Sequence, residues 1–408
     1  MPVCVSSETS VPAQKGLRSP VSRKAERTTS VTEAHSCHSD ADCNYNGRCS
    51  KPAMQKWKCA CDAQWRGDAC DVLNLVSVDK KTPLGYRGTS EDGTPVSSWG
   101  GSVVAGDDGL FHMYASEIVG GCGMNVWLSN SQVIHATSSD PVREPFVKRD
   151  IVAPAFAHEP MAARAPSGEF VVWYTAVLPP GKLPVMGGEA CAGCSDGNSV
   201  ASCGTDGNRN ASVNLPTYMV YSTHPGGPWS DPQLVPGTDV FADSNFAPVI
   251  KDDGSLVALS RSGVWTAPDW RDVESYRQVD SWEDRGEDPM VWIDRRGVFH
   301  CIVHVNRIET TGLVYYSLDG LTWIPSGGGG HAYEHVVQYT DGSSVAFGCR
   351  ERPHIVQNRE GDIIALTTGS SPVTCHSTEE PVSDYSYTLL QVVGQEKRTA
   401  EVPLVMES

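Results

Sequence analysis

Ionisable and hydrogen-bonding side chains mark the starts of five similar segments of this sequence. The segments begin with Ser98-Trp99, His158-Glu159, Asp243 to Asn245, Glu287-Asp288 and Arg350-Glu351-Arg352. If these starts meet in space, crowded carboxyl groups acquire different pKa values, so that one stays protonated while another stays ionised. Hydrolysis of a glycosidic bond needs such a pair, because an acid protonates the leaving oxygen and a carboxylate acts on the other face of the sugar. The alternative is that these carboxylates only pair with the neighbouring arginines.

The five segments are the first halves of a repeated pair of predicted strands. Each pair has an apolar run, a polar turn with glycine, and a second run rich in β-branched and aromatic residues, which is typical of a β-hairpin. The pairs span residues 98–114, 158–173, 245–259, 287–302 and 350–366.

A second repeated element follows three of the pairs, at residues 135–141, 221–229 and 316–323. We interpret it as a third strand that ends in a tight turn and leads to an outer strand. Four strands in each of five copies predict an all-β fold, a five-bladed β-propeller. A β-sandwich with chance similarity is the alternative. In a propeller the inner strands surround one axis, so their starts converge at one mouth of the central channel.

The composition restricts the classes of partner. Hydrophobic residues make up 39% and charged residues 20% of the 408 positions, as expected of a globular protein. The formal net charge of -17 makes nucleic acid and anionic membrane surfaces poor partners. No apolar run approaches the length of a membrane-spanning helix, so we predict no membrane span.

The cysteines point to an oxidising compartment. Six of the 14 fall between Cys37 and Cys70, in a short loop-rich stretch. The first 30 residues show no apolar region of a signal peptide, which conflicts with that inference. We resolve the conflict in favour of a secreted or lumenal protein; a cytosolic protein with reduced thiols is the alternative.

Three regions follow one another along the chain. Residues 1–35 are rich in Ser, Thr, Pro and basic residues and are predicted to be a disordered arm. Residues 36–71 hold six cysteines, which allow fifteen pairings from sequence alone. Residues 72–408 form the predicted propeller domain.

The closing stretch of the small module, Cys-x-Cys followed by an aromatic residue, Gly and a last Cys, resembles the EGF-like family. The resemblance implies the disulfides Cys37–Cys49, Cys43–Cys59 and Cys61–Cys70. A zinc site is the weaker alternative, because structural zinc ligands usually come as two close pairs. EGF-like modules often serve as spacers or adhesion units, so a protein partner bound through this module is expected.

The stretch 178–216 interrupts the repeat and is rich in Pro, Gly, Ser and Asn. It contains Cys191, Cys194 and Cys203, which we expect to form disulfides rather than a zinc pair. Its Asn210-Ala-Ser212 is a glycosylation sequon, so Asn210 is predicted to carry a glycan.

Residues 95–395 resemble the five-bladed propeller glycosidases of glycoside hydrolase families 43 and 32. Glu287-Asp288-Pro289 is similar to the Arg-Asp-Pro motif of the invertase-like members, whose Asp stabilises the transition state. Glu351 lies one blade later, as does the acid/base Glu of those enzymes. The resemblance implies a secreted glycosidase in which Asp288 stabilises charge and Glu351 is the general acid. Glu159 is our candidate for the base.

The sequence departs from these families in the first blade. Both families place an essential Asp at the start of the first inner strand, where this chain reads Ser-Ser-Trp-Gly at 97–100. Either the active site has been rebuilt around Glu159, Asp288 and Glu351, or catalysis has been lost. The second hypothesis is therefore a non-catalytic carbohydrate-binding or adhesion protein, and the third is a protein-interaction propeller with no glycan role.

Further side chains are expected to bind the carbohydrate. A tryptophan stacks on a sugar face and an asparagine bonds hydroxyls, although the loop around Trp127 could instead be a disulfide-fixed loop with a core tryptophan. Arginines would bind hydroxyls, or a carboxylate or sulfate on the sugar. The predicted substrate-binding residues are Trp99, Asn125, Trp127, His158, Asn245, Glu287, Arg350 and Arg352.

No cofactor is expected to be required. The resemblance to family 43 implies a structural calcium beside a central histidine, for which the candidates are His158, His304 and His354. A solvent-filled channel with unpaired histidines is the alternative.

Overall fold

The computed structural model describes ten stretches of the chain. They are residues 36–52, 56–90, 93–124, 127–176, 215–238, 244–281, 286–307, 310–328, 330–372 and 385–394. The predicted arm 1–35, the sequon at Asn210, and Asn125 lie outside the described residues, as do Cys191, Cys194 and Cys203.

Five four-stranded antiparallel sheets make up the large domain. Blade 1 consists of β8 (Ser98–Ala105), β9 (Phe111–Ile118), β10 (Ser131–Ser138) and β11 (Val147–Ala153). Blade 2 consists of β12 (Ala157–Arg164), β13 (Phe170–Ala176), β14 (Thr217–Ser222) and β15 (Gln233–Leu234). Blade 3 consists of β16 (Ala247–Ile250), β17 (Leu256–Ser260), β18 (Gly263–Ala267) and β19 (Arg277–Ser281). Blade 4 consists of β20 (Glu287–Ile293), β21 (Phe299–Arg307), β22 (Thr310–Ser317) and β23 (Ile324–Pro325).

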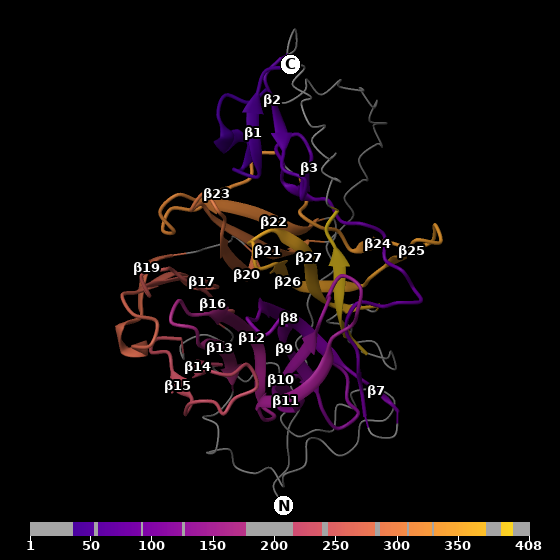
Figure 1. Ribbon diagram of the computed structural model, residues 1–408, viewed down its shortest axis with the longest axis vertical. Helices are drawn as coiled ribbons and strands as arrows, with labels where there is room; N and C mark the ends of the chain where they lie inside the picture. The colour runs from indigo at the N-terminus through magenta and orange to yellow at the C-terminus, as the bar shows by residue number, and fades with distance from the viewer. Residues whose placement is uncertain are drawn as a thin grey trace, which may run out of the picture. The chain divides into compact units, whose positions relative to one another are not determined.

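Blade 5 joins the two ends of the domain. It consists of β26 (Cys349–Gln357), β27 (Ile363–Ser371), β28 (Tyr387–Val392) and β5 (Gly85–Tyr86). The outer strand β5 comes from the beginning of the domain and pairs with β28. Each inner strand contacts the next around the centre, and β26 contacts β8. The all-β fold with five blades is therefore confirmed, with β8, β12, β16, β20 and β26 innermost (Figure 1).

The remaining elements are short. They are η1 (Asp40–Cys43), β1 (Gly47–Ser50), β2 (Lys58–Cys61), β3 (Trp65–Arg66), β4 (Val72–Leu73), β6 (Gly88–Thr89), β7 (Pro95–Val96), α1 (Trp127–Asn130), η3 (Val273–Ser275), β24 (Val336–Gln338) and β25 (Ser344–Ala346). Among the described residues, no helix is long and apolar enough to cross a membrane.

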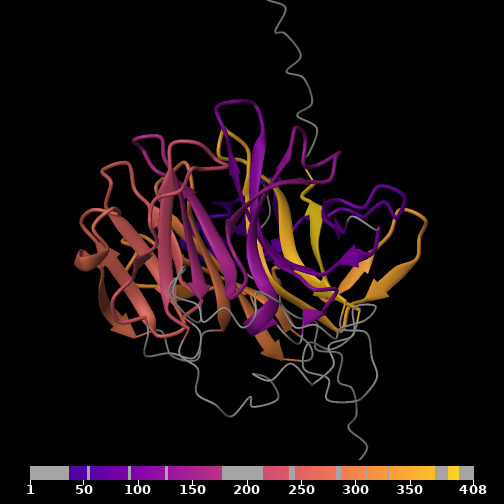
Figure 2. The same ribbon diagram turned by 90° about the horizontal axis from the view of Figure 1, so that it is seen from below.

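The hydrophobic core is divided between neighbouring blades. Trp173 and Met219 of blade 2 pack with Trp265 of blade 3, and Met113 of blade 1 packs with Leu390 of blade 5. Side chains on both faces of the sheets are buried against the neighbouring sheets, and Figure 2 shows the blades side by side. The packing holds the inner strands in a fixed circle, and their starts carry the candidate site.

The three disulfides of the small module join Cys37 to Cys49, Cys43 to Cys59 and Cys61 to Cys70, as predicted. Cys122 and Cys349 are also disulfide-bonded. The domain boundaries at 35 and 71 remain predictions.

Trp65, Cys70 and Leu73 belong to one buried cluster with Trp292 and Tyr333 of the propeller, so the module packs directly on blades 4 and 5.

Asp71 fixes the module to the propeller. Its buried carboxylate accepts hydrogen bonds of 2.8 Å from the Ser326 hydroxyl and from the Gly330 backbone N–H. Loss of a buried acceptor leaves its donors unsatisfied, at about 1–3 kcal/mol each. We expect Asp71→Ala to speed hydrogen exchange throughout residues 36–73, whereas the exposed Asp68→Ala should not. Equal exchange in the two variants would contradict this role.

Candidate functional site

The same backbone feature positions one residue of every blade at the centre. Glu159, Asn245, Asp288 and Arg352 have φ values of 57°, 44°, 54° and 53°, in the left-handed region, and Gly100 of blade 1 has a φ of 66°. A left-handed non-glycine residue costs about 1–2 kcal/mol. Such strain is found mainly at functional sites. We call these five residues the central ring.

The β-ladder is interrupted at four of these positions. Pairing skips from 99 to 102, from 158 to 161, from 287 to 290 and from 351 to 354. A bulge of this kind bends the strand and redirects the side chain of the extra residue. The ring side chains therefore meet one another instead of joining the blade interiors.

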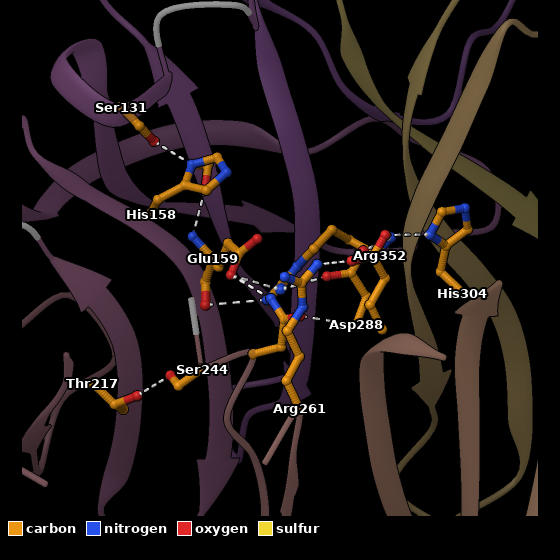
Figure 3. A network of polar contacts seen from close by, with 12 residues as sticks. Ser131, His158, Glu159, Thr217, Ser244, Arg261, Asp288, His304 and Arg352 are labelled. Atoms are coloured by element: carbon orange, nitrogen blue, oxygen red, sulfur yellow. Dashed lines mark hydrogen bonds and ion pairs between the residues drawn. The ribbon is translucent and has the colours of Figure 1, made fainter. Parts of the chain in front are cut away.

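Arg352 lies between the two carboxylates of the ring (Figure 3). Its Nη1 is 3.0 Å from Glu159 Oε2 and 2.9 Å from Asp288 Oδ1. Its backbone N–H donates to Asp288 Oδ2 at 3.2 Å, and Nη2 donates to the Glu159 carbonyl at 3.3 Å. All three side chains are less than one-tenth exposed, so these are buried ion pairs.

Neutral side chains hold Glu159 from two other blades. The Asn245 amide donates to Glu159 Oε2 at 2.9 Å, and the Ser116 hydroxyl accepts from the Glu159 N–H at 3.0 Å. Asn245 Oδ1 faces the Asp288 N–H at 3.5 Å. The ring therefore fixes Glu159 and Asp288 against the same cation.

Four further ionisable groups lie beside the ring, namely the buried His304 and the partly exposed Glu287, Glu351 and Arg261. His304 Nδ1 is 3.6 Å from Glu287 Oε1, and His304 Nε2 is 4.0 Å from Glu351 Oε1. The Glu287 and Glu351 side chains are 20% and 16% exposed. Arg261 contacts Glu287 from blade 3. Sequence analysis missed Arg261 and considered His304 only for calcium, because nothing in their local sequence marks them.

The two acidic groups of blades 4 and 5 differ in proton affinity. Burial raises the pKa of Glu351 to about 7, and the charge of Asp288 adds to this shift, while His304 and Arg352 oppose it. Burial alone would also raise the pKa of Asp288, but the charge of Arg352 outweighs it and holds that pKa below its ordinary value. At neutral pH Asp288 is ionised while much of Glu351 keeps its proton.

The histidines that flank the ring cannot act as acids near neutral pH. Burial, followed by the charge of Arg352, lowers the pKa of both His158 and His354 to about 3. His158 is held by Ser131, with 2.7 Å between Nδ1 and Oγ. Trp127 packs against the His158 ring with a centroid distance of 4.7 Å and is itself half-buried.

Five of the predicted sugar-binding residues are buried, and two of these, Arg350 and Trp99, lie outside the ring and the histidines that flank it. Arg350 is 1% exposed and donates to Thr368 Oγ1, the Glu334 carbonyl and Gln391 Oε1. A carbohydrate cannot reach this guanidinium without displacing those partners. Trp99 is 2% exposed and lies so close to Gly369 that a Cβ there would come within 2.3 Å of its ring. Both side chains stabilise blade contacts in this structure.

Apart from three disulfide-bonded cysteines of the small module, one group of side chains among the described residues is compact enough to hold a metal ion. Single donor atoms of Asp288, His304 and Glu351 all lie within 4.8 Å of one another. Calcium takes six to eight oxygen ligands, whereas this set offers one nitrogen and two carboxylates, one of them already paired with Arg352. The described residues therefore fit calcium poorly, and the calcium site stays a prediction.

Gly100 occupies the ring position where a fifth side chain would stand. A Cβ on Gly100 would lie 3.5 Å from Arg352 Cβ, an ordinary contact. Asp adopts left-handed backbone more readily than most residues, so we expect Gly100→Asp to fold with a loss of about 1–2 kcal/mol. In Gly101→Asp, the new Cβ would meet Thr388 at 2.9 Å, and we expect a larger loss. Chemical denaturation of both variants is the measurement, and equal losses would contradict this account.

Only the comparison with solved structures finds proteins that are similar to this chain. No protein-family model and no curated protein sequence matches the chain. A family 117 glycoside hydrolase from the marine bacterium Zobellia galactanivorans has a TM-score of 0.49 and 11% identity, over 82% of this chain and 91% of that one. A GH43_1 enzyme from Xanthomonas citri has a TM-score of 0.48 and 12% identity, over 78% and 91%. An α-L-arabinofuranosidase from Podospora anserina has a TM-score of 0.47 and 10% identity, over 81% and 97%.

These solved structures are all glycoside hydrolases. At such low identity the likeness concerns the fold alone. The chemistry of this chain must therefore be argued from its own side chains.

Proposed function

We propose that this protein is a secreted glycoside hydrolase whose active site comprises Glu159, Asp288 and Glu351. The observation that carries the proposal is the meeting of two carboxyl groups in one site. Oxygen atoms of Asp288 and Glu351 lie within 4.8 Å of each other, and their surroundings shift the two pKa values in opposite directions, upward at Glu351 and downward at Asp288. Two carboxyls with separated pKa values are the pair that cleavage of a glycosidic bond requires. The disulfides of the small module support an extracellular or lumenal location.

In the proposed mechanism Glu351 donates its proton to the glycosidic oxygen as the bond from that oxygen to the anomeric carbon breaks. Positive charge develops on the sugar ring, and the Asp288 carboxylate stabilises it through space. Glu159 then acts on the opposite face, either by taking a proton from the attacking water or by bonding to the anomeric carbon. The separation of the carboxyls around the bound sugar decides between these routes.

Arg352 and Trp127 have supporting roles in the proposal. Arg352 pairs with both Glu159 and Asp288, and its charge holds the pKa of the buried Asp288 below the ordinary value, so that this carboxylate stays ionised. Trp127 offers a half-buried aromatic face beside His158, on which a sugar ring can stack. The substrate class is a polysaccharide or oligosaccharide, and the small module is proposed to bind a protein partner.

The proposal is tested by hydrolysis across a panel of neutral and anionic polysaccharides. We expect the wild-type protein to release reducing sugar from at least one of them. No release by folded protein from any substrate would contradict the enzymatic proposal, provided that circular dichroism and a cooperative unfolding transition confirm the fold.

A non-catalytic carbohydrate-binding protein is the second candidate, and one observation favours it. Arg352 contacts both Glu159 and Asp288, and Gly100 adds no third carboxylate to the ring, so the carboxylates are already neutralised in part. This candidate predicts that calorimetry detects glycan binding with no released sugar after prolonged incubation. Binding that weakens on Trp127→Ala would place the glycan at this mouth of the channel.

A further inference from the structure

Blade 1 contains a continuous chain of four polar side chains outside the central ring. Asp108 Oδ1 lies 3.2 Å from His112 Nε2, His112 Nδ1 lies 3.0 Å from His135 Nε2, and His135 Nδ1 lies 3.0 Å from Asp150 Oδ2. The two imidazole side chains are 1% and 4% exposed, whereas the carboxylates at the ends are about half exposed. Two buried rings thus face each other between two surface carboxylates.

Two neutral imidazoles cannot satisfy all three contacts. Each neutral ring carries one N–H, so the pair has two protons for three hydrogen bonds. If both rings donate to their carboxylates, two lone pairs face each other across 3.0 Å. If one ring donates to the other, one carboxylate faces a lone pair. Every neutral arrangement therefore leaves one acceptor against another acceptor, and one added proton removes this conflict.

We propose that His112 and His135 form a proton-binding site that holds one extra proton between the two rings. The positive charge lies between the carboxylates of Asp108 and Asp150, each of which accepts an N–H. A second extra proton would place two N–H donors against each other, so the pair takes up one proton only.

Other groups around the pair oppose the uptake. Burial lowers the pKa of each histidine despite its flanking carboxylate. The charge of Arg164 acts in the same direction on His112, and the charges of His112 and Arg149 do so on His135. Arg164 is itself paired with Asp107 at 2.7 Å. The two flanking carboxylates and the contact between the rings favour the proton, and we expect them to prevail for the first proton.

The site lies where blade 1 meets a turn of blade 2. Tyr114 stacks on His135 with a centroid distance of 5.4 Å, and its hydroxyl donates to the Pro225 carbonyl at 2.8 Å. Gly226 is so close to Asp150 that a Cβ there would come within 2.5 Å of Oδ2. Because His135 and Asp150 form this packing surface, the bound proton should tighten the turn 224–229 against blade 1.

Nuclear magnetic resonance of the histidine side-chain nitrogens tests the proposal in the full-length protein. We expect the His112 and His135 rings to titrate together with uptake of one proton, at a higher pH in wild type than in Asp150→Asn. The exposed His38 of the small module serves as an internal control, and its ring signals should be the same in both proteins at every pH. Independent titration of the two rings, or no uptake where the fold persists, would overturn the proposal.

Hydrogen exchange provides a second readout that does not depend on activity. After correction for the intrinsic rate, amides of β10, β11 and the turn 224–229 should be about ten- to a hundredfold more protected when the proton is bound, as one charge-assisted hydrogen bond implies. The amides of blade 3 should show no such change. Protection that falls on acidification would mean that burial prevails, and the site would then be refuted.

Discussion

Glu351→Gln should lower the rate of glycoside hydrolysis by about 10²–10⁴-fold, the usual contribution of a general acid, while leaving the fold intact. Glutamine keeps the shape of the side chain but cannot donate a carboxyl proton to the leaving oxygen. Released sugar is measured on the best substrate of the panel. The exposed Glu360→Gln, at the other end of the same β-hairpin, is the matched control and should retain full activity.

The pH profile separates this role from a merely structural one. Because burial raises the pKa of Glu351 to about 7, the wild-type rate should fall as the pH rises through that value. A substrate with a good leaving group needs no acid, so its hydrolysis by Glu351→Gln should be largely restored. Unchanged activity in the variant would remove Glu351 from the mechanism, even if the protein is a glycosidase.

Stability provides an independent check on the same carboxyl. Its pKa is higher in the folded protein than in the unfolded chain, so the folded state loses stability as the pH rises from about 4 to about 7. Glutamine does not titrate, and Glu351→Gln should therefore be more stable than wild type at pH 8 and similar to it at pH 4. Loss of stability at pH 8 would show that the carboxylate has stabilising partners there.

The blades could be predicted because the local sequence pattern of each repeat indicates a β-hairpin. The five apolar runs, with their glycine turns and β-rich second runs, all correspond to observed inner hairpins, from β8–β9 to β26–β27. The outer strand of blade 5 was missed because β5 has two residues and pairs across nearly the whole domain. Pairing of that kind leaves no local signal.

The central ring could be predicted only in part. The sequence places Arg350, Glu351 and Arg352 next to one another, and this led us to expect two arginines on the substrate. The left-handed backbone at Arg352 instead sends these side chains to different environments. Arg350 lies in the interior of blade 5, Glu351 lies beside His304, and Arg352 lies between two carboxylates. The left-handed backbone of Arg352 could not be predicted from local sequence preferences, because tertiary contacts impose this conformation.

Arg352→Met should destabilise the folded protein by about 3–5 kcal/mol, the cost of removing one partner from a buried ion pair. Methionine fills a similar volume, but the buried carboxyl groups of Glu159 and Asp288 lose their cationic partner. Denaturant unfolding monitored by fluorescence measures the loss. The surface variant Arg295→Met, which breaks an exposed pair with Asp362, should cost less than about 1 kcal/mol.

Low pH and two compensating substitutions should each reduce the stability that Arg352→Met loses, and the two experiments together test the cause of that loss. The pKa of Asp288 is lowered in wild type, so the stability that its pairing supplies is present above about pH 4 and is lost as the pH falls through the folded value. The difference between wild type and Arg352→Met should therefore shrink in acid. Adding Glu159→Gln and Asp288→Asn to Arg352→Met should recover stability at neutral pH, because no uncompensated charge remains. If the triple variant is as unstable as Arg352→Met alone, unpaired charge is not the cause of the loss. Arg352 would then stabilise the ring through packing.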